Sequence, residues 1–194
     1  MIIVPIGVDC RIAQFIKDNK LRSFSFPFDW TVSYNGVSSC ISDDFRLFTE
    51  PLQSRINRYD IYFHHDFDDA HLLQIHREKY VRRYTRLMEL LKSCKEEVIF
   101  CRKGHAVHHH REHNGKYTNI TSDIDDAEKL DSVLRAKYPN LTYKIIVILI
   151  CGDCFQSEQL YTSKSKYIEI HNTASLLPDD NTFTDICCSI FNVQ

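Results

Sequence analysis

A cysteine stands between an apolar run and an amphipathic segment near the start of the chain. Residues 2–6 are apolar and rich in β-branched side chains, and Gly7 interrupts the run. Cys10 then precedes residues 12–16, whose apolar members recur with helical spacing. A thiol at a helix N-terminus faces free backbone N–H groups and the positive end of the helix dipole, and both favour the thiolate. Cys10 is therefore the candidate nucleophile, although most cysteines are small core residues.

A cysteine nucleophile requires a base that accepts its proton and a third group that orients the base. His65 lies in "YFHHDF" beside Asp66, and His171 follows the alternating segment "KYIEI". We predict His65 as the base and keep His171 as the alternative, with Asp29 of "FPFDW" as a candidate to orient the histidine. Backbone N–H groups near Cys10 could bind the oxyanion. Each of these residues also fits a structural, hydrogen-bonded role.

Three residues are candidates for contact with a substrate. Trp30 follows Asp29 and could form one wall of a pocket, and Asp66 could hydrogen-bond a bound group. Arg82 lies in an arginine-rich segment that could meet an anionic group. Packing of aromatic side chains and a solvated basic helix face are the commoner explanations for such residues.

Two motifs, one of cysteines and one of histidines, are candidates for metal binding or redox chemistry. Cys151 and Cys154 form a Cys-x-x-Cys pair after an apolar run, as in thioredoxin-like proteins, but the rest of that pattern is missing. His105, His109 and His113 have a four-residue spacing that could place them on one helical face. Flanking glycines favour an exposed loop instead, whose charge rises below neutral pH. We expect no metal and no cofactor.

The elements that must position these residues alternate between strands and helices. After the first strand and helix, the pattern predicts a helix over 71–93, a strand over 96–103, a polar loop over 104–119, a helix over 121–139, strands over 143–151 and 166–172, and a last helix from 179. This alternation is typical of a mostly parallel sheet flanked by helices. The sequence predicts one α/β domain over residues 1–194.

The composition limits the cellular compartments and the classes of binding partner that we expect for this protein. The chain is 43% hydrophobic and 26% charged, as in ordinary globular proteins, and its net charge of -2 gives no general attraction to nucleic acid or anionic membranes. The aliphatic run "IIVILI" is too short to cross a bilayer, and no signal peptide is recognisable. Eight cysteines without a secretory signal predict reduced thiols. We therefore expect a cytoplasmic protein that binds neither nucleic acid nor membrane.

The first half of the chain, up to Arg102, resembles the DUF1796 family of papain-like cysteine peptidases, which has members in bacteria and large DNA viruses. The resemblance rests on a Gly-x-x-Cys turn, an Arg-Ser pair, Pro-Phe-Asp-Trp, the stretch "YFHHDF" and an Arg-rich helix followed by a strand. The residues that match the opening motif are Gly7, Cys10, Arg22, Ser23, Pro27, Phe28, Asp29 and Trp30. The resemblance implies a cysteine nucleophile and a peptide or protein substrate, in the host cytoplasm for a viral member.

Three hypotheses about function follow. The first is a cysteine hydrolase, either a peptidase or an isopeptidase, with Cys10 as nucleophile and a histidine base. The second is an SGNH-like esterase acting on an ester or an acylated sugar, since Gly7, Asp9 and Cys10 loosely match a Gly-Asp-Ser turn. The third is a viral or bacterial interaction protein without catalysis, in which Cys10 is buried and protonated. Thiol reactivity separates the third hypothesis from the first two.

Overall fold

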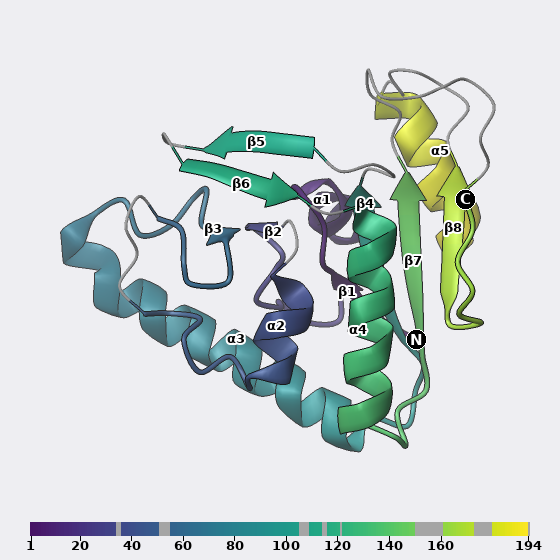
Figure 1. Ribbon diagram of the computed structural model, residues 1–194, viewed down its shortest axis with the longest axis horizontal. Coiled ribbons are helices and arrows are strands. Elements are labelled where there is room, and N and C mark those ends of the chain that lie inside the picture. The colour runs from purple at the N-terminus through teal and green to yellow at the C-terminus, as the bar shows by residue number, and fades with distance from the viewer. Residues whose placement is uncertain are drawn as a thin grey trace.

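The computed structural model describes residues 1–33, 36–50, 55–104, 109–113, 116–120, 122–149, 161–172 and 180–193, and describes the backbone alone over 109–113, 116–120 and 180–181. Figure 1 shows the arrangement of the elements in space. In chain order they are β1 (Ile2–Pro5), α1 (Arg11–Asp18), β2 (Val32–Ser33), α2 (Val37–Ser42), β3 (Ile61–Tyr62), the 3-10 helix η1 (Ala70–Leu72), α3 (Leu73–Ser93), β4 (Val98–Gly104), β5 (His109–His113), β6 (Lys116–Ile120), α4 (Asp123–Lys137), β7 (Tyr143–Leu149), β8 (Ile168–Asn172) and α5 (Asp180–Phe191).

The main sheet has four strands in the order β1-β4-β7-β8, and all three neighbouring pairs are parallel. β4 and β7 lie in the middle, so both of their faces are covered. This explains why "VIFC" and "IIVIL" read as continuous apolar runs rather than alternating ones. The α/β fold with a parallel sheet flanked by helices, predicted from the sequence, is confirmed.

The two faces of the sheet carry separate hydrophobic cores, with α2, α3 and α4 on one side and α1 and α5 on the other (Figure 1). The first core is the larger and includes Phe26, Phe28, Phe45, Phe48 and Phe63 of the segment 26–63. The helix residues of the second core are Ile12, Phe15 and Ile16 of α1 and Phe183, Cys187 and Phe191 of α5. α1 therefore lies flat on the sheet through one apolar stripe, with Cys10 at its first turn.

Local sequence signals account for the helix ends. Ser122 caps α4, because its Oγ accepts a hydrogen bond from the N–H of Asp125 at 3.1 Å. Three aspartates in the first turn of α4 complement the helix dipole, and Pro139 follows the last turn. The long α3 begins after η1, where Asp69 accepts a hydrogen bond from the N–H of His71 at 2.8 Å.

The polar segment after β4 is where the sequence prediction was wrong. Instead of a loop, its described residues form an antiparallel hairpin in which His109 pairs with Ile120 and His113 with Lys116. In a strand, residues four apart lie about 13 Å from each other, so His109 and His113 do not share a helical face. His105, Cys151 and Cys154 lie outside the described residues.

The connections after β1 and β4 leave toward opposite faces of the sheet. β1 is followed by α1 on one face, whereas β4 leads through the hairpin to α4 on the other. In open α/β sheets, ligands bind beyond the carboxyl ends of adjacent strands that diverge in this way. The turn Gly7–Cys10 and the end of β4 meet at this point of the sheet.

Candidate functional site

Cys10 is the N-cap residue of α1 and is partly exposed. Its carbonyl oxygen accepts the N–H of Gln14 at 2.8 Å, which starts the helix, and Asp9 Oδ1 accepts the N–H of Arg11 at 3.0 Å. By contrast, Cys40 and Cys101 are fully buried, and burial raises the pKa of both thiols well above the usual value. Cys10 is thus more exposed than these two thiols, and it lies at the start of a helix, where the sequence placed it.

Lys103 reaches the Cys10 turn from the end of β4. Its ammonium forms an ion pair with Oδ2 of Asp9, and its side chain is 8% exposed. The backbone is also close, because a Cβ on Gly7 would lie 3.3 Å from the N of Lys103. Lys103 therefore fixes the turn that carries the thiol. Lys103 was not predicted as a site residue, since a lysine at the end of an apolar strand gives no local signal of a partner 94 residues away.

β2 lies between the Cys10 turn and the segment that contains His65. The N–H of Ser33 donates to the carbonyl of Gly7 at 3.2 Å, and Val32 packs against Val8. On its other side β2 pairs with β3, where Ser33 faces Ile61. Three segments far apart in the sequence are thus held side by side, and His65 follows β3 directly.

His65 packs against Trp30 and does not reach the thiol. The two rings meet edge to face with centroids 6.3 Å apart, and the imidazole is exposed. Among the histidines whose side chains the structure describes, none forms a hydrogen bond with Cys10. The structure thus brings Cys10, Trp30 and His65 to the same side of the fold, with β2 between the thiol and the imidazole.

Asp29 is fully buried and contacts Arg22 instead of a histidine. Its Oδ2 accepts a hydrogen bond from Nη2 of Arg22, which also donates to Ser25 Oγ at 2.8 Å. Oδ1 of Asp29 and Nη1 of Arg83 are buried without a hydrogen-bond partner. Burial raises the pKa of the Asp29 carboxyl, although the charges of Arg22 and Arg83 oppose the rise. In this geometry Asp29 holds Arg22 and the aromatic loop in place.

Asp66 is the centre of a buried polar cluster at the start of α3. Its carboxylate accepts hydrogen bonds from Lys79 and from the Tyr80 hydroxyl, the latter at 2.7 Å, and His76 Nε2 lies 3.3 Å from Oδ1. Nδ1 of His76 accepts the N–H of Phe67 at 2.8 Å. Burial alone would raise the pKa of Asp66, but the hydrogen bonds and charges of these neighbours outweigh it and lower the pKa. Asp66 therefore has a structural role in this fold.

We predict that Asp66→Asn lowers the free energy of unfolding at pH 7 by about 1–3 kcal/mol, because it removes the charge that Lys79 and His76 face. A carboxyl pKa that is lowered in the folded state stabilises the fold above the unfolded pKa, near 3.8, and this contribution is lost as the pH falls through the folded pKa. Urea unfolding at pH 7 and pH 3 therefore should show a difference between variant and wild type that shrinks in acid.

Asp68→Asn is the matched control for Asp66→Asn. Asp68 is 60% exposed and lies 3.9 Å from Arg55, so its loss should cost less than about 1 kcal/mol. Equal losses for the two variants, or a loss for Asp66→Asn that does not depend on pH, would contradict a buried, ionised Asp66.

The other two predicted residues lie apart from Cys10. His171 is on β8, three strands from β1, which corresponds to about 14 Å across the sheet, and its Nε2 lies 2.6 Å from Oε1 of Glu169. Arg82 is exposed on α3. The structure therefore brings Trp30 and His65 into contact, with β2 between His65 and the Cys10 turn, and places Asp29 and Asp66 in buried positions.

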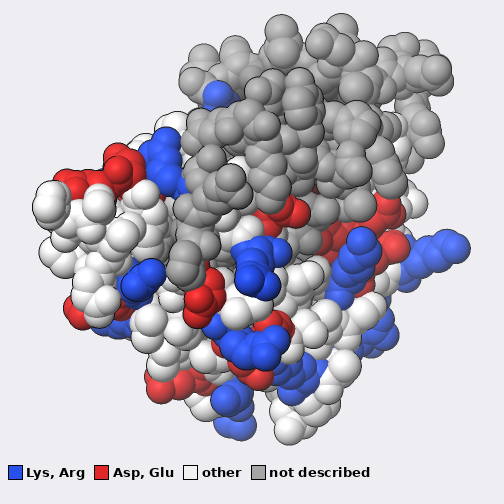
Figure 2. All heavy atoms as spheres, turned by 60° about the vertical axis from the view of Figure 1, so that its left-hand side comes forward, with Lys and Arg blue, Asp and Glu red and all other residues white. Residues whose placement is uncertain are grey.

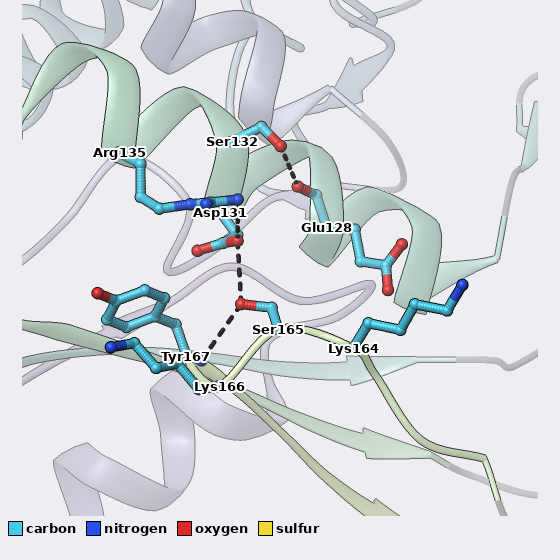
Figure 3. A pocket seen from close by; sticks show the side chains of 8 residues that line it. All are labelled: Glu128, Asp131, Ser132, Arg135, Lys164, Ser165, Lys166 and Tyr167. Carbon is cyan, nitrogen blue, oxygen red and sulfur yellow. Dashed lines mark hydrogen bonds and ion pairs between the residues drawn. The ribbon is translucent and has the colours of Figure 1, made fainter.

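A pocket of about 520 Å³ lies between α4 and the segment that leads into β8 (Figure 3). Asp131 at its base accepts hydrogen bonds from Tyr143 at 2.5 Å and from Ser165 at 3.0 Å, and it pairs with Arg135 at 2.8 Å. The buried carboxylate is thus already satisfied by protein groups. None of the residues predicted as a site lines this pocket.

A smaller pocket of about 300 Å³ lies between α1 and α5. Arg11, the residue after Cys10, lines it together with Gln14, and Phe15 and Phe183 give it apolar walls. This pocket provides room for a side chain next to the candidate nucleophile.

The described residues hold no group of three or more His, Cys, Asp or Glu side chains arranged to bind a metal ion. All six cysteines within the described ranges are free. No helix among these residues has the length and apolar character needed to cross a membrane.

No protein-family model matches this chain. No curated protein matches it, and no solved structure does. The resemblance to the DUF1796 family therefore stays a prediction.

Proposed function

We propose that this chain is a cysteine hydrolase, a peptidase or isopeptidase, in which Cys10 is the nucleophile. The observation that carries the proposal is the place of the thiol. Cys10 is partly exposed at the first turn of α1, beyond the carboxyl end of β1, and the Lys103 ammonium is anchored on the adjacent Asp9. Reactive cysteines in other proteins lie in partly exposed surroundings of this kind, at helix N-termini and beside cationic side chains.

The first turn of α1 also supplies donors for an oxyanion. The N–H groups of the first three helical residues have no acceptor within the helix. The N–H of Arg11 donates to Asp9. The N–H groups of Ile12 and Ala13 therefore remain as donors at the end of the helix that carries Cys10. Donors fixed before the reaction stabilise the charge that develops on a carbonyl oxygen.

His65 is the base in this proposal, because β2 and β3 hold it on the side of the fold where Cys10 lies. His65 does not contact the thiol, so Cys10 reacts as the thiolate: Sγ bonds to the carbonyl carbon, and the carbonyl oxygen takes the negative charge. Collapse of this intermediate breaks the C–N bond, and the leaving nitrogen takes the proton from His65. Water then attacks the thioester and gives its proton to His65, the C–S bond breaks, and Sγ leaves as the thiolate.

Limited alkylation with iodoacetamide at pH 7, followed by peptide mapping, tests the nucleophile. Cys94 is the matched control, because it is also partly exposed but is the C-cap of α3, at the negative end of a helix dipole. We expect Cys10 to react about tenfold faster than Cys94, since the two dipoles act in opposite directions. Cys94 reacting as fast as Cys10 would contradict the proposal.

Lys103→Met provides a second arm of the same experiment. Removing the ammonium leaves the Asp9 carboxylate unpaired beside Cys10, and a negative neighbour disfavours the thiolate. The alkylation rate of Cys10 should therefore fall in this variant, whereas that of Cys94 should not change. An unchanged rate at Cys10 would show that Lys103 has no influence on the thiol.

A further inference from the structure

The side chains around Trp30 form a basic and aromatic surface, which we call the Trp30 shelf and define as Lys17, Arg22 and Trp30. Lys17 Nζ and the Arg22 guanidinium carbon each lie 6.0 Å from the centre of the indole ring. The His65 ring meets the indole edge to face, with the centroids 6.3 Å apart. Two cations, one in α1 and one shortly after it, thus lie at the same partly exposed ring.

The two acidic residues nearest to the Trp30 shelf in the sequence both have hydrogen-bond partners within the described protein. Asp18, next to Lys17, accepts hydrogen bonds from Gln14 Nε2 at 2.7 and 2.8 Å. Asp29 is buried and paired with Arg22, and no carboxylate of a described residue forms an ion pair with Lys17. The indole attracts the two cations only weakly, by about 0.5–1 kcal/mol at an exposed site. Asp29 offsets the charge of Arg22, so the positive charge of the shelf that no ion pair with a described carboxylate offsets is that of Lys17.

We propose that the Trp30 shelf binds an anionic group of the substrate, the side-chain carboxylate of an acidic peptide. This rests on the proposed hydrolase function and adds a substrate class to it. The carboxylate would lie between Lys17 and Arg22, with peptide carbon atoms against the indole.

The spacing between the shelf and the nucleophile sets where the acidic residue lies. Gln14 and Lys17 are exposed on α1, four and seven residues after Cys10. With a rise of 1.5 Å per residue, Lys17 lies about 10 Å along the helix from Cys10. An extended peptide covers about 3.3 Å per residue. The acidic side chain is thus about three residues from the bond that Cys10 attacks.

A peptide carboxylate fits the shelf better than a nucleic acid does. A polyanion needs a row of cations along its backbone, whereas Lys17 and Arg22 converge on a single ring. Figure 2 shows Lys and Arg interspersed with Asp and Glu on the face it presents, without one broad basic field. The net charge of the chain is -2.

Trp30 is the single tryptophan of the chain, so its fluorescence reports binding at the shelf directly. The experiment uses the full chain with Cys10→Ser, which prevents turnover during the titration. The probes are a blocked alanine pentapeptide with a central Glu and the same peptide with a central Gln. We expect the Glu peptide to bind at least about fivefold more tightly at low salt, and this preference to disappear at 0.5 M salt, because screening weakens exposed charge pairs.

Lys17→Gln tests the shelf without disturbing the fold, because Lys17 is exposed and its interaction with described residues is the contact over the indole. It should remove most of the Glu preference, whereas Lys92→Gln, an equal loss of charge near the end of α3, should leave it intact. Arg22→Gln should act like Lys17→Gln, and its unfolding free energy reports any loss of the Asp29 contact.

Three results would overturn the shelf proposal: equal affinity for the two peptides, a Glu preference that survives Lys17→Gln, or tighter, more salt-dependent quenching by oligothymidylate than by the Glu peptide. If the shelf fails while Cys10 still alkylates faster than Cys94, the substrate class is wrong and the nucleophile stands. A Glu preference together with an unreactive Cys10 would leave a peptide-binding site without catalysis.

Discussion

Replacing Arg102 with methionine is expected to lower the free energy of unfolding at pH 7 by about 3–5 kcal/mol. Arg102 is 0% exposed at the end of β4, and its guanidinium bonds Asp123 through Nε and Asp126 through Nη1, the latter at 2.9 Å. Nη1 also donates to the carbonyl of Ile6 at 3.1 Å. Methionine fills a similar volume but leaves two buried carboxylates without their cation. A domain with a total stability of about 5–15 kcal/mol would lose a large part of it.

The loss should depend on pH in a defined direction. Burial raises the pKa of Asp126 and Asp123 adds to the rise, while Arg102 opposes it. Without Arg102 the carboxyl pKa rises further in the folded state. A raised pKa contributes stability below the unfolded pKa, near 3.8, and this contribution is lost as the pH rises through the folded pKa. Urea unfolding should therefore show the variant closer to the wild type at pH 4 than at pH 7.

Arg135→Met is the matched control, since Arg135 also pairs with an aspartate of α4 but is 57% exposed. Its loss should cost less than about 1 kcal/mol. The double variant Asp123→Asn and Asp126→Asn in the Arg102→Met background should recover part of the stability, because the uncompensated charges are gone. Equal costs for Arg102→Met and Arg135→Met would contradict the role given to the buried network.

Much of the fold could be predicted because its elements bury continuous or periodic apolar surface. β7 is apolar at almost every position and lies between two strands, and α4 combines a Ser122 cap with a helical stripe. The β5–β6 hairpin was missed for the opposite reason. Its strands are polar and lack an alternating apolar face, so their pairing through backbone hydrogen bonds leaves no hydrophobic signal in the sequence.

The candidate site was predicted in part. Cys10 carries a local signal, because a strand, a turn and an amphipathic helix follow one another within a short stretch. Its neighbours carry none, since Lys103 pairs with Asp9 across 94 residues and Arg102 bonds Ile6 across 96. Such contacts depend on how β1 and β4 pair, which no short segment specifies. For Asp66 the local signal was misleading. Its place in "YFHHDF" suggested substrate binding, but its carboxylate accepts hydrogen bonds from Lys79 and Tyr80 of α3.

Cys10→Ser is expected to reduce turnover by at least about a thousandfold, because removing a nucleophile abolishes the covalent route and leaves only the contribution of binding and oxyanion donors. Turnover is measured on a library of fluorescence-quenched peptides and on lysine-linked isopeptides. The free energy of unfolding should change by less than about 1 kcal/mol, since Cys10 is partly exposed and the replacement is close in size. Cys94→Ser, a change of the same kind at the end of α3, should leave turnover intact.

Two histidine variants then separate the candidates for the base. His65→Ala should reduce turnover about a hundredfold or more, the usual contribution of a positioned general base, whereas His171→Ala should have little effect because β8 lies three strands from β1. A large loss of turnover in His171→Ala alone would show that His171 is the base. The substrate would then have to extend across the sheet from β1 to β8. Full turnover in Cys10→Ser, or none in the wild type on any peptide or isopeptide, would refute the proposed hydrolase. Turnover of acylated sugars but not of peptides would make it an esterase with the same nucleophile.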